Sequence, residues 1–107
     1  MRLLEWSKEE PWTITMELVK GEPLHEYLYR KGTLTENQAR NIVIQLLDAG
    51  AYMHAFNVFH RDLKLENIMI NDLDQKVTVI DYGYCCHQKI TQLKQGTESS
   101  YAPELFT

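Results

Sequence analysis

The feature that most constrains how this chain can fold is a polar stretch, residues 60–67, that leads directly into two short apolar runs. The runs, residues 68–70 and 77–80, are separated by a polar segment rich in turn-forming residues, so the pattern predicts a β-hairpin. Antiparallel pairing brings the residue before the first strand, Asn67, next to the residue after the second strand, Asp81. The polar stretch and Asp81 are therefore predicted to meet at the open end of one hairpin.

A second hairpin and a short helix are predicted upstream. Residues 3–6 and 12–16 hold apolar side chains in alternation with polar ones, as expected of two paired strands. Residues 19–23 supply turn-forming residues. Apolar side chains then recur at helical spacing over residues 24–31, and Gly32 is typical of a helix end.

A long helix and a long loop follow. Thr35 with Gln38 forms a capping box, and the apolar periodicity that begins there predicts a helix that ends near Asn57. Gly50 interrupts this helix, which favours close packing against another element. Residues 81–107 show no sustained period, which predicts a long loop, and loops of that length in compact domains are usually functional.

Charge and composition exclude several classes of protein. The 107 residues carry a formal net charge of -4, which argues against a nucleic-acid binder driven by electrostatics. No apolar run approaches the roughly 20 residues that span a bilayer, and residues 1–10 do not resemble a signal peptide. The two cysteines, Cys85 and Cys86, are neighbours that cannot form a disulfide framework, and with His87 they lack a fourth ligand at a zinc-like spacing. We therefore expect no nucleic-acid or membrane partner and a cytoplasmic, and also nuclear, location.

The open end of the predicted 68–80 hairpin holds side chains suited to phosphate chemistry. Asn67 and Asp81 offer hard oxygen ligands for Mg²⁺ that is also held by substrate phosphates. Asp62 could accept a proton from an attacking hydroxyl, and Lys64 could neutralise charge on a transferring phosphoryl group. Each residue alone also has a structural reading, in which it caps or builds a turn.

Three motifs in order decide between these readings. Residues 60–67 fill the pattern H-R-D-L-x-x-x-N, residues 81–83 read D-Y-G in place of D-F-G, and residues 102–104 read A-P-E. In this order and strand context they match the protein-kinase signature. The chain therefore resembles the eukaryotic protein kinases, and His-Arg-Asp-Leu-Lys at residues 60–64 is similar to the serine/threonine branch.

The resemblance implies a role for each matching residue. Asp62 is the implied catalytic base, Lys64 lies beside the transferred phosphate, and Asn67 and Asp81 are the implied Mg²⁺ ligands. Thr97 resembles the threonine that contacts the catalytic aspartate and lysine. The implied cofactors are ATP and Mg²⁺, and the implied partner is a protein substrate with serine or threonine hydroxyls.

The adenine site is also implied by resemblance. Residues 16–19 resemble the gatekeeper and hinge of the family, whose backbone groups bind adenine. Leu24 and Met69 match the apolar residues that sandwich the adenine ring in the family. The candidates for nucleotide binding are therefore Met16, Glu17, Val19, Leu24 and Met69. For Leu24 a place in the hydrophobic core is an equally good reading.

The implied architecture is an α/β protein kinase fold that is truncated. Residues 1–17 would form the last strands of the small lobe, and residues 18–107 the hinge, the start of the large lobe, and the catalytic and activation loops. Residues 2–6 and 79–83 are most similar to the Pim branch. No G-x-G and no V-A-I-K occurs in the 107 residues, so we expect residues 1–107 by themselves to be inactive.

Two other functions are consistent with the sequence. A non-catalytic binding module could keep the base and the metal ligands while lacking the phosphate clamp. A small-molecule phosphotransferase shares the H-x-D-x-x-x-x-N and D-x-G patterns, but Arg61, Lys64 and the A-P-E motif argue against it. Transfer of phosphate from ATP to a peptide would distinguish a protein kinase from both.

Overall fold

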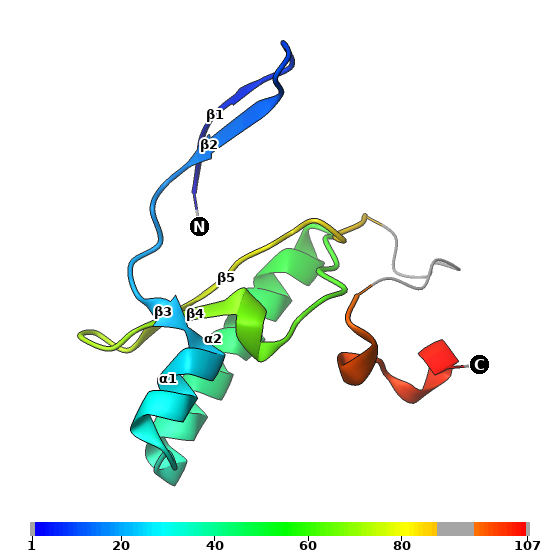
Figure 1. The fold of residues 1–107 in the computed structure, drawn as a ribbon. Helices are drawn as coiled ribbons and strands as arrows, with labels where there is room; N and C mark the ends of the chain where they lie inside the picture. Colours follow the sequence, from blue (N-terminus) through cyan, green and yellow to red (C-terminus); the bar gives the residue numbers. More distant parts are fainter. Residues whose placement is uncertain (1, 88–95, 107) are drawn as a thin grey trace.

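A computed structural model describes residues 2–87 and 96–106, so residues 88–95 and Thr107 of the predicted long loop lie outside the described part. Figure 1 shows three parts that follow one another along the chain: an N-terminal hairpin that projects from one end, a central body of strands and two helices, and a C-terminal segment of short helical turns. The mixed α/β architecture agrees with the class expected from the sequence.

The N-terminal hairpin pairs β1 (Leu3–Ser7) with β2 (Thr13–Met16) in antiparallel fashion. Both strands were predicted from alternating apolar and polar residues, and the pairing confirms them. At the open end of the hairpin, the backbone amide of Glu17 donates to the carbonyl of Arg2 over 2.8 Å. This bond continues the pairing by one step and holds the exit of β2 against the entry of β1.

The central sheet has the strand order β3-β4-β5. The predicted second hairpin is present as β4 (Ile68–Asn71) and β5 (Lys76–Val79), which pair antiparallel. Its partner β3 (Glu22–Pro23) was expected to be part of a turn, and that expectation was wrong. A two-residue strand is too short to show a period, and a proline, which cannot donate a ladder hydrogen bond, is tolerated here because β3 is at the edge of the sheet.

The connection into β3 requires glycine at one position. Gly21 has a φ of +127°, which L side chains rarely adopt. A Cβ atom there would lie 2.2 Å from the carbonyl oxygen of Ile70 in β4. The backbone of residue 21 therefore packs directly on the sheet.

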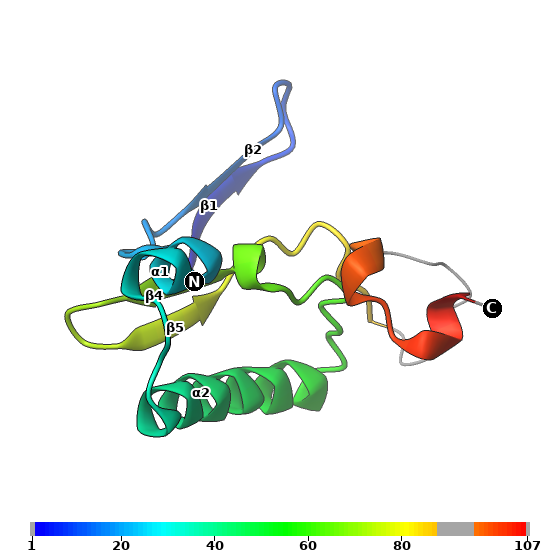
Figure 2. The same cartoon turned by 60° about the horizontal axis from the view of Figure 1, so that its bottom comes forward.

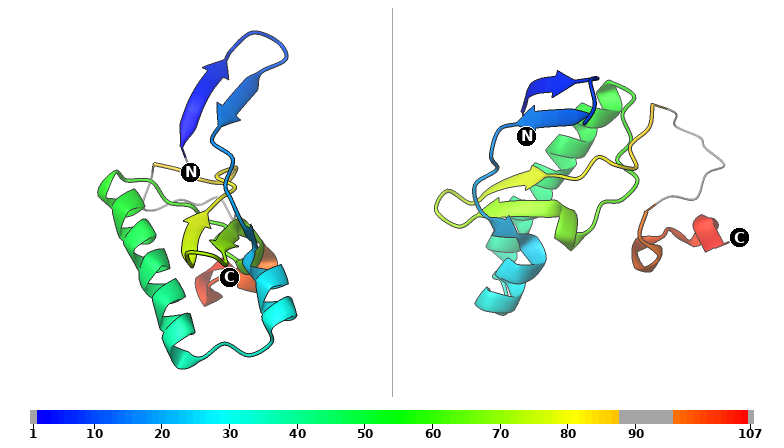
Figure 3. Two further views of the ribbon diagram at one scale, coloured as in Figure 1. Left: turned by 90° about the vertical axis from the view of Figure 1, so that its left-hand side faces the viewer. Right: turned by 45° about the horizontal axis from the view of Figure 1, so that its top comes forward.

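Both predicted helices are present. Helix α1 (Leu24–Lys31) ends at Gly32, and helix α2 (Glu36–Ala55) begins after the predicted Thr35 capping box and ends two residues before Asn57. Figure 2 shows α2 running beneath the β4–β5 hairpin, and the left panel of Figure 3 shows the two helices on either side of it. Neither helix of the described chain has the length and apolar character needed to cross a bilayer.

The core lies where the two helices meet β4. Its buried residues come from α1, α2 and β4, namely Leu24, Tyr27, Ile42, Ile68 and Ile70. Helix α2 turns one face to this core. Ile42 on that face is 4% exposed, whereas its neighbour Val43 is 50% exposed. Close packing of Gly50 was predicted wrongly, since a Cβ there would meet no atom of the described structure within 4 Å.

Gln45 of α2 ties the helix to the edge strand β5. Its amide nitrogen donates to the carbonyl of Gln75 over 2.8 Å, and its amide oxygen accepts from the backbone amide of Val77 over 2.9 Å. One side chain therefore satisfies two backbone groups at the start of β5. Helical periodicity did not single out this residue, because the periodicity records only apolar positions.

We predict that Gln45→Met lowers the free energy of unfolding by about 1–3 kcal/mol, because the Val77 amide loses its partner while the side-chain volume is nearly kept. Chemical denaturation of both proteins measures the difference. The matched control is Asn41→Met, at an exposed position one turn earlier on α2, which should change stability by about 0.5 kcal/mol or less. Equal effects of the two substitutions would contradict the prediction.

Candidate catalytic site

The site is assembled at the open end of the β4–β5 hairpin. Asn67 ends a short 3-10 helix, Leu65–Asn67, and its backbone carbonyl accepts from the amide of Ile80 over 2.9 Å. Asp81 is the next residue, so the register places it one step beyond this bond. Asn67 is 5% exposed, whereas Asp81 lies on the surface.

Asp62 lies at the centre of a hydrogen-bond network. It is 7% exposed, and its Oδ2 accepts from the Asn67 amide nitrogen over 3.2 Å. The same Asn67 nitrogen is 2.9 Å from the Asp62 backbone carbonyl, which it also approaches as a donor. Lys64 Nζ lies 3.8 Å from Oδ2. The polar stretch is thus folded around the carboxylate that the sequence singled out.

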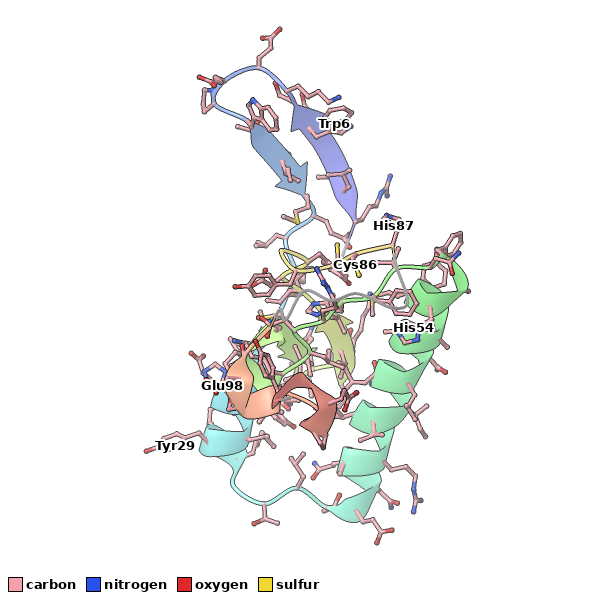
Figure 4. The ribbon with its side chains drawn as sticks, turned by 90° about the vertical axis from the view of Figure 1, so that its right-hand side faces the viewer. Trp6, Tyr29, His54, Cys86, His87 and Glu98 are labelled. Carbon is pink, nitrogen blue, oxygen red and sulfur yellow. The ribbon has the colours of Figure 1, made fainter. Side chains whose placement is uncertain are left out.

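Thr97 reaches this centre from the distant C-terminal segment. Its hydroxyl donates to Asp62 Oδ1 over 2.8 Å and accepts from Lys64 Nζ over 2.5 Å. The contacts that the resemblance implied for Thr97 are therefore present. Because one hydroxyl oxygen serves both charged groups, it fixes their separation. Figure 4 labels Glu98, which begins the short turn Glu98–Ser100 directly after Thr97.

Gly96 lets Thr97 come this close, and sequence reasoning gave it no role of its own. Its φ is +110°, and a Cβ there would lie 2.4 Å from the carbonyl oxygen of Arg61. Any side chain at residue 96 would push the two segments apart. The signal was the glycine directly before a threonine in an otherwise aperiodic loop.

His60 positions the backbone of Asp62. In the sequence, residue 60 was identified only as part of the H-R-D-L-x-x-x-N pattern, without a role of its own. It is 5% exposed. Its Nδ1 accepts from the backbone amide of Asp62 over 3.1 Å, and its Nε2 lies 2.9 Å from the carbonyl oxygen of Ile80, to which it donates. The ring therefore links the carbonyl of Ile80, the residue before Asp81, to the backbone amide of Asp62.

The pKa of Asp62 reflects competing influences. Burial by itself raises it, but the Thr97 hydrogen bond, the Lys64 charge and the Asn67 amide together hold the pKa below its ordinary value. The carboxylate is therefore ionised at neutral pH. Because the folded-state pKa is lowered, this ionised group stabilises the fold at neutral pH, and the contribution is lost as the pH falls through the folded value.

The segment after β5 is held in an unusual backbone conformation. Asp81 has a φ of +59°, in the left-handed region, and its Oδ1 accepts from the Gly83 amide over 3.3 Å.

Two further side chains act on this segment. Burial, and to a smaller extent Cys85, raises the pKa of Tyr82, so its hydroxyl stays protonated. Arg61 binds the same segment, since its Nε donates to the Tyr84 carbonyl over 2.6 Å.

The five predicted nucleotide contacts lie around the connection between the hairpin and the body. Met16 and Glu17 follow one another at the end of β2, and Val19 is half-buried in the connection. Met69 lies on the face of β4 opposite Ile68 and Ile70, as strand alternation requires. Leu24 is 3% exposed within the core cluster, which leaves almost none of its side chain accessible to a ring.

The donor set of the hairpin end fits Mg²⁺ better than a transition metal. Asn67 uses its amide nitrogen to bind Asp62, which leaves the amide oxygen as a ligand atom, and Asp81 adds a carboxylate. Hard oxygen donors in small number suit a cation that keeps phosphate and water ligands. Within residues 2–87 and 96–106, no group of three or more His, Cys, Asp or Glu side chains could hold a metal, and this includes Cys86 and His87, labelled in Figure 4.

The fold and the arrangement of residues 60–67, 81 and 97 were compared with those of known proteins. Residues 2–107 match the family model described as the protein kinase domain, so the chain belongs to the protein kinase domain family. A solved kinase structure, the Cydia pomonella granulovirus kinase PK-1, superimposes with a TM-score of 0.85 at 26% sequence identity, covering 95% of this chain and 38% of the viral protein. The α/β protein kinase fold expected from the sequence is confirmed for these residues.

Curated relatives are protein kinases of several organisms. The chain is 36% identical over 97 residues to the human phosphorylase b kinase gamma catalytic chain, liver/testis isoform, covering 87% of this chain and 23% of the relative. It is 37% identical over 108 residues to the meiosis-specific serine/threonine-protein kinase mek1 of Schizosaccharomyces pombe, covering 95% and 24%. The chain thus spans about a quarter of the length of these relatives.

We predict that Thr97→Val raises the pKa of Asp62. The substitution keeps the shape of the side chain but removes the hydroxyl that lowers the pKa, so the effect of burial is no longer fully offset. Titration of the Asp62 carboxyl carbon by NMR measures the change. Thr13→Val, on the exposed strand β2, is the control and should leave the titration unchanged. A Thr97→Val protein with an unaltered Asp62 titration would contradict this account of the network.

Proposed function

We propose that the protein transfers the γ-phosphate of ATP to serine or threonine hydroxyls of protein substrates. The observation that carries the proposal is the buried Asp62 carboxylate, which is held between Thr97, Lys64 and Asn67 at the end of a hairpin. Family membership and the serine/threonine-protein kinase relatives support it. Cytoplasmic and nuclear locations belong to the same proposal.

The roles follow from the geometry of the described residues. Asp62 accepts the proton of the substrate hydroxyl. At the same time the hydroxyl oxygen of the substrate bonds to the γ-phosphorus, and the bond from that phosphorus to the leaving ADP oxygen breaks. The lowered pKa of Asp62 keeps it ionised and able to orient that hydroxyl. Lys64 places its ammonium beside the same carboxylate, where negative charge on the transferred group needs neutralising.

Asn67 and Asp81 would hold Mg²⁺ at the open end of the hairpin, where Asn67 precedes β4 and Asp81 follows β5. Bound Mg²⁺ supplies neutralisation of the phosphate charge and orients the phosphates. The protein contributes the fixed register that places Asn67 next to Ile80, and the buried bonds from Asn67 to Asp62. Metal site and base are therefore positioned by the same side chain.

The adenine contacts complete the proposal. Backbone groups of residues 17–19 follow directly after β2, and strand alternation places Met69 on the face of β4 that does not carry Ile68 and Ile70. Leu24 is the weakest member of the set, because the core already encloses it.

We predict that Asp62→Asn lowers turnover by at least about 100-fold while the affinity for Mg²⁺ and ATP changes little, because an amide cannot accept the proton. The assay uses the full-length protein, labelled ATP, and matched peptides that contain serine, threonine or tyrosine. Asp48→Asn, on an exposed position of α2, is the control and should keep full activity.

Other outcomes separate the rival functions. Mg²⁺-dependent ATP binding without phosphate transfer to any peptide would favour a non-catalytic binding module. Transfer to tyrosine alone would contradict the serine/threonine assignment. Turnover that is unaffected by Asp62→Asn would show that the base has been misassigned.

A further inference from the structure

A tyrosine stands at the centre of the D-Y-G segment, and its hydroxyl makes a bond that phenylalanine could not make. Tyr82 Oη donates to the backbone carbonyl of Val79 over 3.1 Å. Val79 is the last residue of β5 and is 5% exposed. The bond therefore joins the D-Y-G segment back to the sheet from which it departs.

This bond spans the residue with the unfavourable backbone. Between Val79 and Tyr82 lie Ile80 and Asp81, and Asp81 is in the left-handed region with a φ of +59°. A left-handed conformation is uncommon for residues other than glycine and persists where the surroundings hold it. The hydrogen bond from the Tyr82 hydroxyl to Val79 therefore closes a loop that contains Asp81.

The aromatic ring of Tyr82 makes a second contact, to His60. The ring centroids are 5.1 Å apart at an interplanar angle of 64°, which is an edge-on arrangement. His60 is itself fixed by the Ile80 carbonyl and the Asp62 amide. The ring therefore keeps its position without the hydroxyl, and the two contacts can be separated by experiment.

We propose that the Tyr82 hydroxyl is a positioning group for Asp81: by binding the Val79 carbonyl it holds the left-handed backbone that aims the Asp81 carboxylate. Within the described structure this carboxylate also accepts from the Gly83 amide over 3.3 Å, so a change in the backbone at Asp81 alters that bond too. The metal role of Asp81 belongs to the proposed function, and this inference rests on it only for its effect on Mg²⁺.

The test compares Tyr82→Phe with Tyr84→Phe in the full-length protein. Tyr82→Phe removes the hydroxyl and keeps the ring on His60, whereas Tyr84 is 45% exposed and serves as the control. Loss of one neutral hydrogen bond shifts an equilibrium by about two- to tenfold. Amide hydrogen exchange of Gly83 and Cys85 should therefore be two- to tenfold faster in Tyr82→Phe and unchanged in Tyr84→Phe.

A second measurement connects the backbone to the metal. The dissociation constant for Mg²⁺, titrated in the presence of a non-hydrolysable ATP analogue, should rise by a similar factor in Tyr82→Phe, while the KM for the peptide substrate stays unchanged. A merely structural defect would alter the peptide KM as well. Unchanged amide exchange in Tyr82→Phe, or a raised peptide KM, overturns the inference.

Failure of the proposed function has a different signature. If Asp81→Asn leaves Mg²⁺ affinity unchanged, Asp81 is not a metal ligand and the proposed function loses that residue. Faster exchange at Gly83 in Tyr82→Phe would then still support the hydroxyl as the group that holds the backbone. The two results are obtained from separate variants, so each hypothesis fails on its own measurement.

Discussion

The register of the β4–β5 hairpin is the constraint on which the candidate site depends. Ile68 pairs with Val79, and one step further the Ile80 amide binds the Asn67 carbonyl. A slip of one residue would turn Ile68 and Ile70 away from the core and displace Asp81 by about 3.3 Å relative to Asn67. The same strand pairing therefore buries the apolar side chains and places the candidate catalytic groups.

Most of the fold could be predicted because its signals are local. The capping box at Thr35, the alternation in β1 and β2, and the apolar runs of β4 and β5 depend on residues a few positions apart, and the structure contains each element. The polar side chains of residues 60–67 could be identified for the same reason, because the H-R-D-L-x-x-x-N motif is defined by a fixed spacing. Short-range patterns report on geometry that the backbone itself imposes.

The remainder depends on contacts between distant segments. Gln45 binds Val77, and Thr97 binds Asp62, across 32 and 35 positions of sequence. No periodicity in residues 81–107 indicates where Thr97 lies, and only the resemblance to a family linked it to Asp62. The environment of Gly50 was predicted wrongly because a glycine in a helix is equally consistent with a close contact and with open space.

The close packing of Gly21 on Ile70 has a mechanical consequence for the N-terminal hairpin. Gly21 is fixed to the sheet by its contact with β4, and Glu17 is fixed to the hairpin by its bond to Arg2. Only residues 18–20 lie between these two points, and Leu18 is 90% exposed. Any rotation of the hairpin against the body is thus concentrated in the torsion angles of three consecutive residues, and one of the three, Val19, is itself a proposed adenine contact.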